Sequence, residues 1–150
     1  MKLAEALQER ADLNRRIQQL QQRLGNNAIV QEKEKPIEDP NTLLAELDRC
    51  VANLEDMITR INLTNCHTMV DGESLTALLA RRDALKLKLG AYRDLAYRAS
   101  LVGQRASGRE IKLLSAVNVP QLQKEIDALA RELRLLDNSI QAANWATELD

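Results

Sequence analysis

Aliphatic residues recur three or four positions apart in this chain, and this spacing constrains its fold most strongly. In the first stretch the repeat consists of Leu3, Ala6, Leu13, Ile17, Leu20 and Leu24. Residues so spaced share one face of an α-helix. Aromatic residues make up only 2% of the chain and phenylalanine is absent, so any core must be aliphatic. The sequence therefore predicts helices that pack through leucine-rich seams.

The repeat predicts four long helices, over about residues 2–24, 40–64, 74–99 and 119–144. Cap residues support the starts: Asp39 precedes Pro40, and Ser74 and Asn118 stand before the third and fourth stretches. At the junctions we expect a stop at Gly25-Asn26-Asn27 and a turn at Asp71-Gly72.

Two further segments, at about 28–31 and 110–117, are expected to be short strand-like pieces that could pair with each other. The predicted fold class is all-α, an antiparallel up-down bundle of the four helices. A chain of 150 residues is typical of one domain, so residues 1–150 are expected to form a single helical-bundle domain. The main rival is a long coiled-coil hairpin that closes only on dimerisation.

The stretch Asn62–Thr68, "NLTNCHT", combines a glycosylation-type triplet, one of the two cysteines and the only histidine. Its glycosylation-type triplet requires secretion, and adjacent Cys66 and His67 would point about 100° apart on a helix, which argues against a catalytic pair. One cysteine and one histidine are too few ligands for a structural zinc ion. We expect a helix end here, with no metal and no catalytic residue.

Charge is unevenly distributed, although the net charge is only −1. Residues 26–80 carry four Lys/Arg and ten Asp/Glu, whereas residues 81–112 carry nine Lys/Arg and three Asp/Glu. Pairing between neighbouring helices explains this contrast. Only two aromatic residues, Tyr92 and Tyr97, lie among the basic ones, too few for a base-stacking surface, so no nucleic-acid partner is expected.

The N-terminal stretch lacks the apolar region of a secretory signal, and no apolar run approaches the ~18 residues of a membrane span. We therefore expect a cytoplasmic protein that has no membrane partner and keeps its two cysteines as thiols.

No glycine-rich phosphate loop, nucleophile elbow or metalloprotease motif occurs, so a non-catalytic protein without a cofactor is the first hypothesis. The alternative is a small-ligand or enzymatic site at one end of the bundle. If the two strand-like pieces pair, several polar residues could converge there. They are Asn26, Asn27, Gln31, Glu32, Glu110 and Lys112.

Two features of the seams point to assembly. Leu87 and Leu135 fall outside the predicted seams, and a helix with leucines on two faces often has two partners. Arg10 and Arg82 interrupt the seams, and Asp83 follows Arg82 directly. These arginines either fix register and oligomeric state or pair with carboxylates at the rim of the core. The sequence predicts a homo-oligomer, a dimer or higher, acting as a scaffold or interaction protein.

The segments "MKLAEALQERADLNRRIQQL", "NNAIVQE", "EDP", "RINLTN", "ALLARRDALKLKL", "REIK" and "NW" resemble a family of small bacterial helical proteins. Some members carry the name septicolysin, and many are labelled only as a family of unknown function. The resemblance runs over nearly the whole chain. The septicolysin name implies a secreted, thiol-activated pore-forming toxin, a third hypothesis beside the scaffold and the ligand site.

Overall fold

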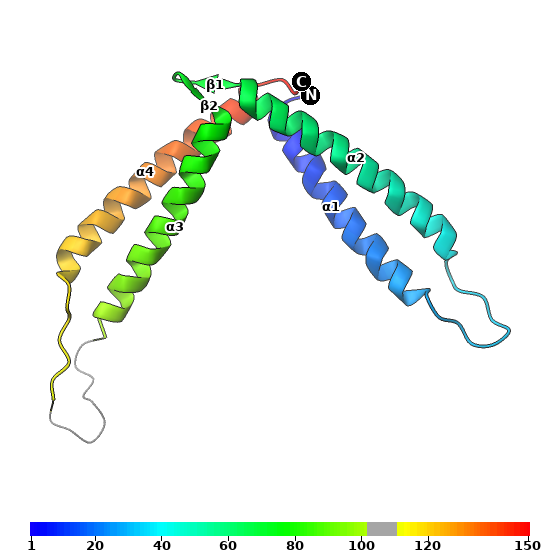
Figure 1. Cartoon of the computed structure of the whole chain (residues 1–150), viewed down its shortest axis with the longest axis horizontal. Coiled ribbons are helices and arrows are strands. Elements are labelled where there is room, and N and C mark those ends of the chain that lie inside the picture. Colours follow the sequence, from blue (N-terminus) through cyan, green and yellow to red (C-terminus); the bar gives the residue numbers. More distant parts are fainter. Residues whose placement is uncertain (102–110) are drawn as a thin grey trace. The chain divides into compact units, whose positions relative to one another are not determined.

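A computed structural model describes residues 1–101 and 111–150 of the chain (Figure 1). Within them, the helices are α1 (Leu3–Asn26), α2 (Pro40–His67), α3 (Leu75–Ala99) and α4 (Val119–Ala146). One small sheet pairs β1 (Met69–Val70) with β2 (Glu73–Ser74). The predicted all-α, helical-bundle class with four long helices is confirmed.

Three helices begin at the caps that the sequence predicts. The Asp39 carboxylate accepts the backbone N–H two residues further on at 3.1 Å. Ser74 and Asn118 each accept the N–H three residues further on, at 3.2 and 3.1 Å. These side chains satisfy backbone donors that a helix leaves without an internal partner.

The predicted turn at Asp71-Gly72 is also confirmed, since it joins β1 to β2. Both residues have left-handed backbones, with φ of 51° and 87°. A two-residue hairpin turn of this hand favours an Asp-Gly pair, because glycine adopts positive φ without strain.

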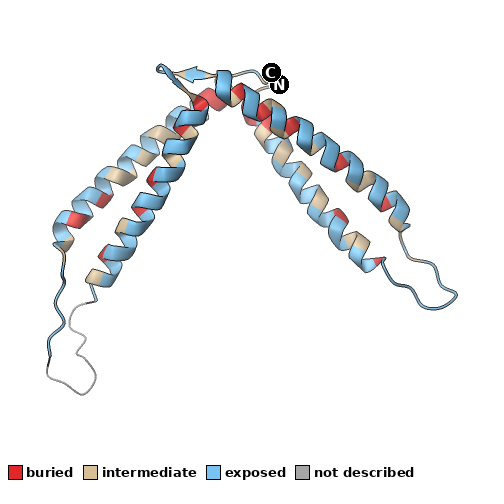
Figure 2. Cartoon of the chain, viewed as in Figure 1, coloured by how far each residue is buried: buried red, intermediate tan, exposed pale blue. Residues whose placement is uncertain are grey.

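The chain divides into two compact units, one of Met1–Met69 with Ala142–Asp150 and one of Val70–Gln141. The expectation of a single domain stays a prediction. In the first unit α1 and α2 run antiparallel and bury Leu20, Leu43 and Cys50 between them. Figure 2 shows how the buried residues recur along each helix.

The second unit is also an antiparallel helical hairpin. Its buried cluster takes Leu89 and Ala96 from α3 and Leu122 and Ile126 from α4. Partly buried neighbours pack against this cluster, and they are Tyr92, Val117, Leu129, Ala130 and Leu133. The core is therefore aliphatic with one tyrosine at its edge, as the composition predicts.

The prediction of a strand-like piece at residues 28–31 is wrong. The N–H groups of Ala28 and Glu34 donate back to the Gly25 and Gln31 carbonyls, and no residue of 28–31 is extended into a strand. Ile29 is 89% exposed, so burial does not favour a strand here. Apolar side chains suggested a strand, but local turns satisfy the backbone instead.

The second strand-like piece was expected at 110–117, and residues 111–117 contain no strand beyond a single β-bridge residue, Lys112. The Ser115 hydroxyl donates to the Val117 carbonyl at 2.8 Å and accepts the Val117 N–H at 3.4 Å. This local bonding accompanies a bend at residues 116–117, just before α4. Glu110 lies outside the described residues.

Helix α2 continues three residues beyond the predicted end at 64. Thr64 is 1% exposed, and its hydroxyl accepts the backbone N–H of Asp150 at 3.0 Å. The Thr64 carbonyl also accepts the Thr68 N–H at 2.9 Å, so helical bonding runs on. Packing against the last residues of the chain overrides the turn preference of Asn62 and Asn65.

The first prediction concerns the core of the first unit. Leu20→Ala should lower the free energy of unfolding by about 2–5 kcal/mol, because Leu20 is fully buried and leaves a cavity. The matched control is Ile37→Ala in the same unit, where the side chain is 99% exposed and the change should cost less than ~0.5 kcal/mol. Urea denaturation followed by circular dichroism measures both. Equal losses would contradict this description of the core.

Candidate functional site

The α1–α2 hairpin presents two chemically different sides. Arg16 and Arg23 lie seven residues apart on α1, and both form ion pairs with acidic residues of the α2 region. Ile17 and Leu24 follow them in sequence, about 100° further around the helix. We call the side with the two ion pairs the charged side, and the side with Ile17 and Leu24 the apolar groove.

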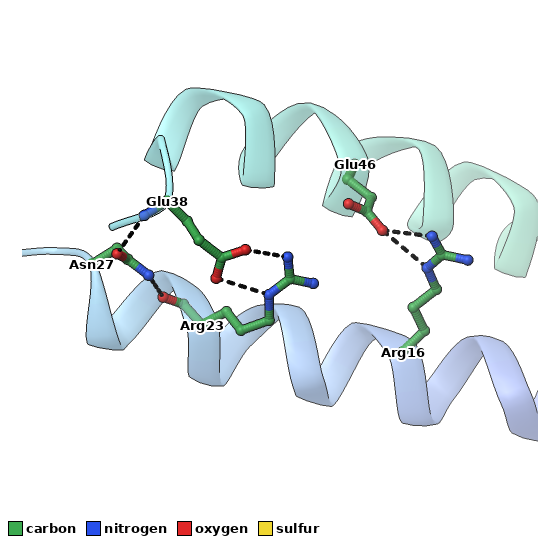
Figure 3. Close-up of polar contacts among 5 residues, drawn as sticks. All are labelled: Arg16, Arg23, Asn27, Glu38 and Glu46. Atoms are coloured by element: carbon green, nitrogen blue, oxygen red, sulfur yellow. Dashed lines mark hydrogen bonds and ion pairs between the residues drawn. The ribbon is translucent and has the colours of Figure 1, made fainter. Parts of the chain in front are cut away.

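The charged side consists of Arg16, Arg23, Glu38 and Glu46 (Figure 3). Arg16 donates from Nε and Nη2 to one oxygen of Glu46, at 3.0 and 2.6 Å. Arg23 donates from Nε to Glu38 at 3.0 Å and from Nη2 to its other oxygen. Such two-bond contacts fix a guanidinium and a carboxylate in one orientation.

Asn27 completes this side at the end of α1 (Figure 3). Its amide nitrogen donates to the Arg23 carbonyl at 2.8 Å, and its oxygen accepts the Glu38 N–H at 2.9 Å. The side chain is 8% exposed. Asn27 therefore ties the end of α1 to the residue before the Asp39 cap.

Hydrogen bonds from the arginines lower the pKa values of Glu38 and Glu46 below the ordinary glutamate value. The same bonds raise the pKa values of Arg23 and Arg16. All four groups therefore stay charged at neutral pH, which suits a clamp between helices and not proton transfer.

Helix periodicity places the apolar groove, a surface of exposed and half-buried side chains, on the other side of the same hairpin. Ile17, Leu24 and Leu47 border the buried cluster and are only half-buried. Leu44 and Val51, seven residues apart on α2, are 45% and 47% exposed. The half-buried Leu54 and Ile58 continue these rows. The groove is thus defined by Ile17, Leu24, Leu44, Leu47, Val51, Leu54 and Ile58.

The polar residues predicted to form a ligand site belong to different elements of the chain. Asn26 is the last residue of α1, Asn27 has both amide groups satisfied as described, and Gln31 and Glu32 are exposed in the following loop. Lys112 is exposed in the second unit, and Glu110 lies outside the described residues. Their convergence stays a prediction, but the strand pairing that was to bring it about is not formed.

The "NLTNCHT" stretch contacts the last residue of the chain, which the sequence did not indicate. His67 Nδ1 lies 3.1 Å from a carboxylate oxygen of Asp150, and Arg60 Nε donates to the Asp150 carbonyl at 2.7 Å. No group of three His, Cys, Asp or Glu suited to a metal ion occurs among residues 1–101 and 111–150. The contacts hold the last residues against α2.

The two seam arginines differ. The Arg82 side chain is 24% exposed and its Nη2 lies 3.2 Å from the Asp83 carboxylate, as in the alternative of pairing at the rim. Arg10 is half-buried, and its guanidinium has no hydrogen bond or ion pair with the described part of the chain. Arg10 stands seven residues before Ile17, in line with the apolar groove.

The second unit contains a shallow hollow of about 340 Å³ between α3 and α4. Lys88 Nζ lies 5.6 Å from the centre of the Tyr92 ring, and Glu125 and Glu132 line the opposite wall. One lysine, one tyrosine and two carboxylates provide no recognisable catalytic arrangement.

None of the helices, as far as the structure describes them, is long and apolar enough to cross a membrane.

The charged side generates a pH prediction. A carboxylate whose pKa is lowered by folding stabilises the fold above the unfolded pKa, about 4.5, and this contribution disappears as pH falls through the folded pKa. The double variant Glu38→Gln/Glu46→Gln should therefore lose less Tm than the natural chain when pH is lowered from 5 to 3. Thermal unfolding followed by circular dichroism tests this.

The matched control is Glu9→Gln, since the Glu9 carboxylate on α1 is exposed and has no partner in the described residues. Its pH dependence should follow that of the natural chain. If the double variant also follows the natural chain, the two ion pairs do not contribute to stability.

Comparisons with known proteins show the family of this chain and give no activity. The solved structures include a chain with a TM-score of 0.94 and 40% sequence identity, the crystal structure of a functionally unknown conserved protein from Corynebacterium diphtheriae. The similarity covers 100% of this chain and 99% of that one. No curated protein matches. A family model matches residues 10–149, and the chain therefore belongs to a family of unknown function (DUF6847).

Proposed function

We propose that this protein is a non-catalytic, self-associating helical scaffold or interaction protein of the cytoplasm. The observation that carries the proposal is the apolar groove of the α1–α2 hairpin. Leu44 and Val51 remain about half exposed there, beside five half-buried aliphatic residues. A contiguous aliphatic surface of this kind is typical of an interaction site.

The energetics favour association through such a surface. Full burial of a leucine, isoleucine or valine side chain stabilises by about 1.5–3 kcal/mol relative to exposure. Even half of that, over several side chains, offsets a large part of the entropy lost when two chains associate.

The outer faces of the second unit add further apolar surface. Leu87 is 78% exposed and Leu135 is 51% exposed, consistent with their expected position outside the helix seams. Isolated exposed leucines are ordinary, so these two support the proposal less than the continuous groove does.

The polar groups on the charged side support the proposal of a non-catalytic role. The carboxylates of Glu38 and Glu46 and the guanidinium groups of Arg16 and Arg23 bind one another. Groups bound to one another in this way join the two helices and are not directed toward a substrate.

Self-association is tested by light scattering coupled to size-exclusion chromatography. The chain has a mass of 16.9 kDa, and at micromolar concentration we expect twice that mass or a higher multiple. A mass that stays at one chain up to 100 micromolar would contradict the proposal.

The ligand-site and pore-forming hypotheses stay predictions. Dye release from liposomes, measured with and without reductant, tests the pore-forming hypothesis. Release by the purified chain would favour a toxin over a scaffold.

A further inference from the structure

Three charged side chains beside the apolar groove are without partners in the described part of the chain. Arg10 lies in line with Ile17 and Leu24 on α1, at the same seven-residue spacing. Asp48 and Glu55 are exposed on α2 and follow Leu44 and Val51 by four residues. Because residues four apart share one side of a helix, both carboxylates border the groove.

The ion pairs of the charged side give the register of the hairpin. Arg16 pairs with Glu46 and Arg23 with Glu38, so residues at the same height on the two helices have numbers adding to about 62. Arg10 therefore lies level with residues 51 and 52 of α2. Asp48 and Glu55 lie three to four residues to either side of that level, each about 5 Å along the helix axis.

Within one hairpin, Arg10 does not bind either carboxylate. In a pair of hairpins related by a two-fold axis parallel to the helices, α1 of one copy lies beside α2 of the other at the same height. The groove of each copy then covers the groove of the other, and Arg10 lies between Asp48 and Glu55 of the second copy.

We infer that the apolar groove of the α1–α2 hairpin binds the same groove of a second copy, with Arg10 of each chain between Asp48 and Glu55 of the other. This inference rests on the proposed function and assigns its contact surface. The two hairpins together form an antiparallel four-helix bundle with a closed aliphatic core.

The chemistry of the groove favours a second copy over an unrelated partner. The surface carries one cation on the α1 side and two anions on the α2 side, at matching heights, so it is complementary to itself. An arginine at this place can cover the apolar row with its aliphatic stem and keep its charge at the edge, where it would fix the register.

A charge-exchange experiment tests this contact. Arg10→Glu places like charges against Asp48 and Glu55 of a second copy, and Asp48→Lys/Glu55→Lys does so against Arg10. Each variant alone should associate at least ~10-fold more weakly than the natural chain. An equimolar mixture should regain association to within about threefold, because both contacts become attractive again.

Arg131→Glu is the matched control, since Arg131 is exposed on α4 and also without a partner among the described residues. This variant should associate like the natural chain. Far-UV circular dichroism confirms that each variant is helical, and recovery in the mixture shows independently that both are folded.

The outcomes separate the two claims. Sedimentation equilibrium that finds the natural chain monomeric would overturn the proposed function and the contact with it. A natural chain that associates, together with single variants that associate equally well or a mixture that does not recover, would overturn the contact and leave the proposed function standing.

Discussion

A hairpin of two helices can bury only the stripe of each helix that faces the other, and α2 has more apolar surface than one stripe. Leu43 and Cys50 are buried against α1, whereas Leu44 and Val51, one position further around, are about half exposed. The opposite side of the hairpin is closed by the Arg16–Glu46 and Arg23–Glu38 pairs. The groove therefore remains as the side on which a further helix pair can pack.

In this hairpin the charged side sets the register of the two helices, and the apolar groove provides the surface for association. The paired arginines and glutamates, with Asn27, fix the register of α1 against α2 and cap the junction between them. Exposed ion pairs contribute little to stability, but their geometry sets which residues share a height along the hairpin. That register places Arg10 level with the middle of the groove.

Much of the fold follows from the sequence. The leucine repeats and the caps at Asp39, Ser74 and Asn118 gave the helices, because both depend on local geometry. The extension of α2 through His67 was missed because Asp150 binds Thr64 across 86 residues, a contact that no local pattern indicates. The strand-like pieces failed because apolar residues in a short segment do not by themselves supply a partner strand.

The functional surface was harder to predict than the fold. The aliphatic repeat does not distinguish the rows of α2 from one another, and only the structure shows which row is buried and which is exposed. Arg10 was recognised as an interruption of its seam, whereas Asp48 and Glu55 entered only the count of acidic residues in 26–80. Their relation to Arg10 depends on the height at which two helices pass each other, and the sequence does not specify it.

Zero-length cross-linking between chains tests the central claim most directly. Arg10→Lys keeps the charge and gives carbodiimide an amine to join to a carboxylate. In a mixture of light and nitrogen-15-labelled copies, mutual packing of the grooves predicts products that join position 10 of one isotope to Asp48 or Glu55 of the other. Products that join these positions only within one isotope, or no such products, would contradict the account.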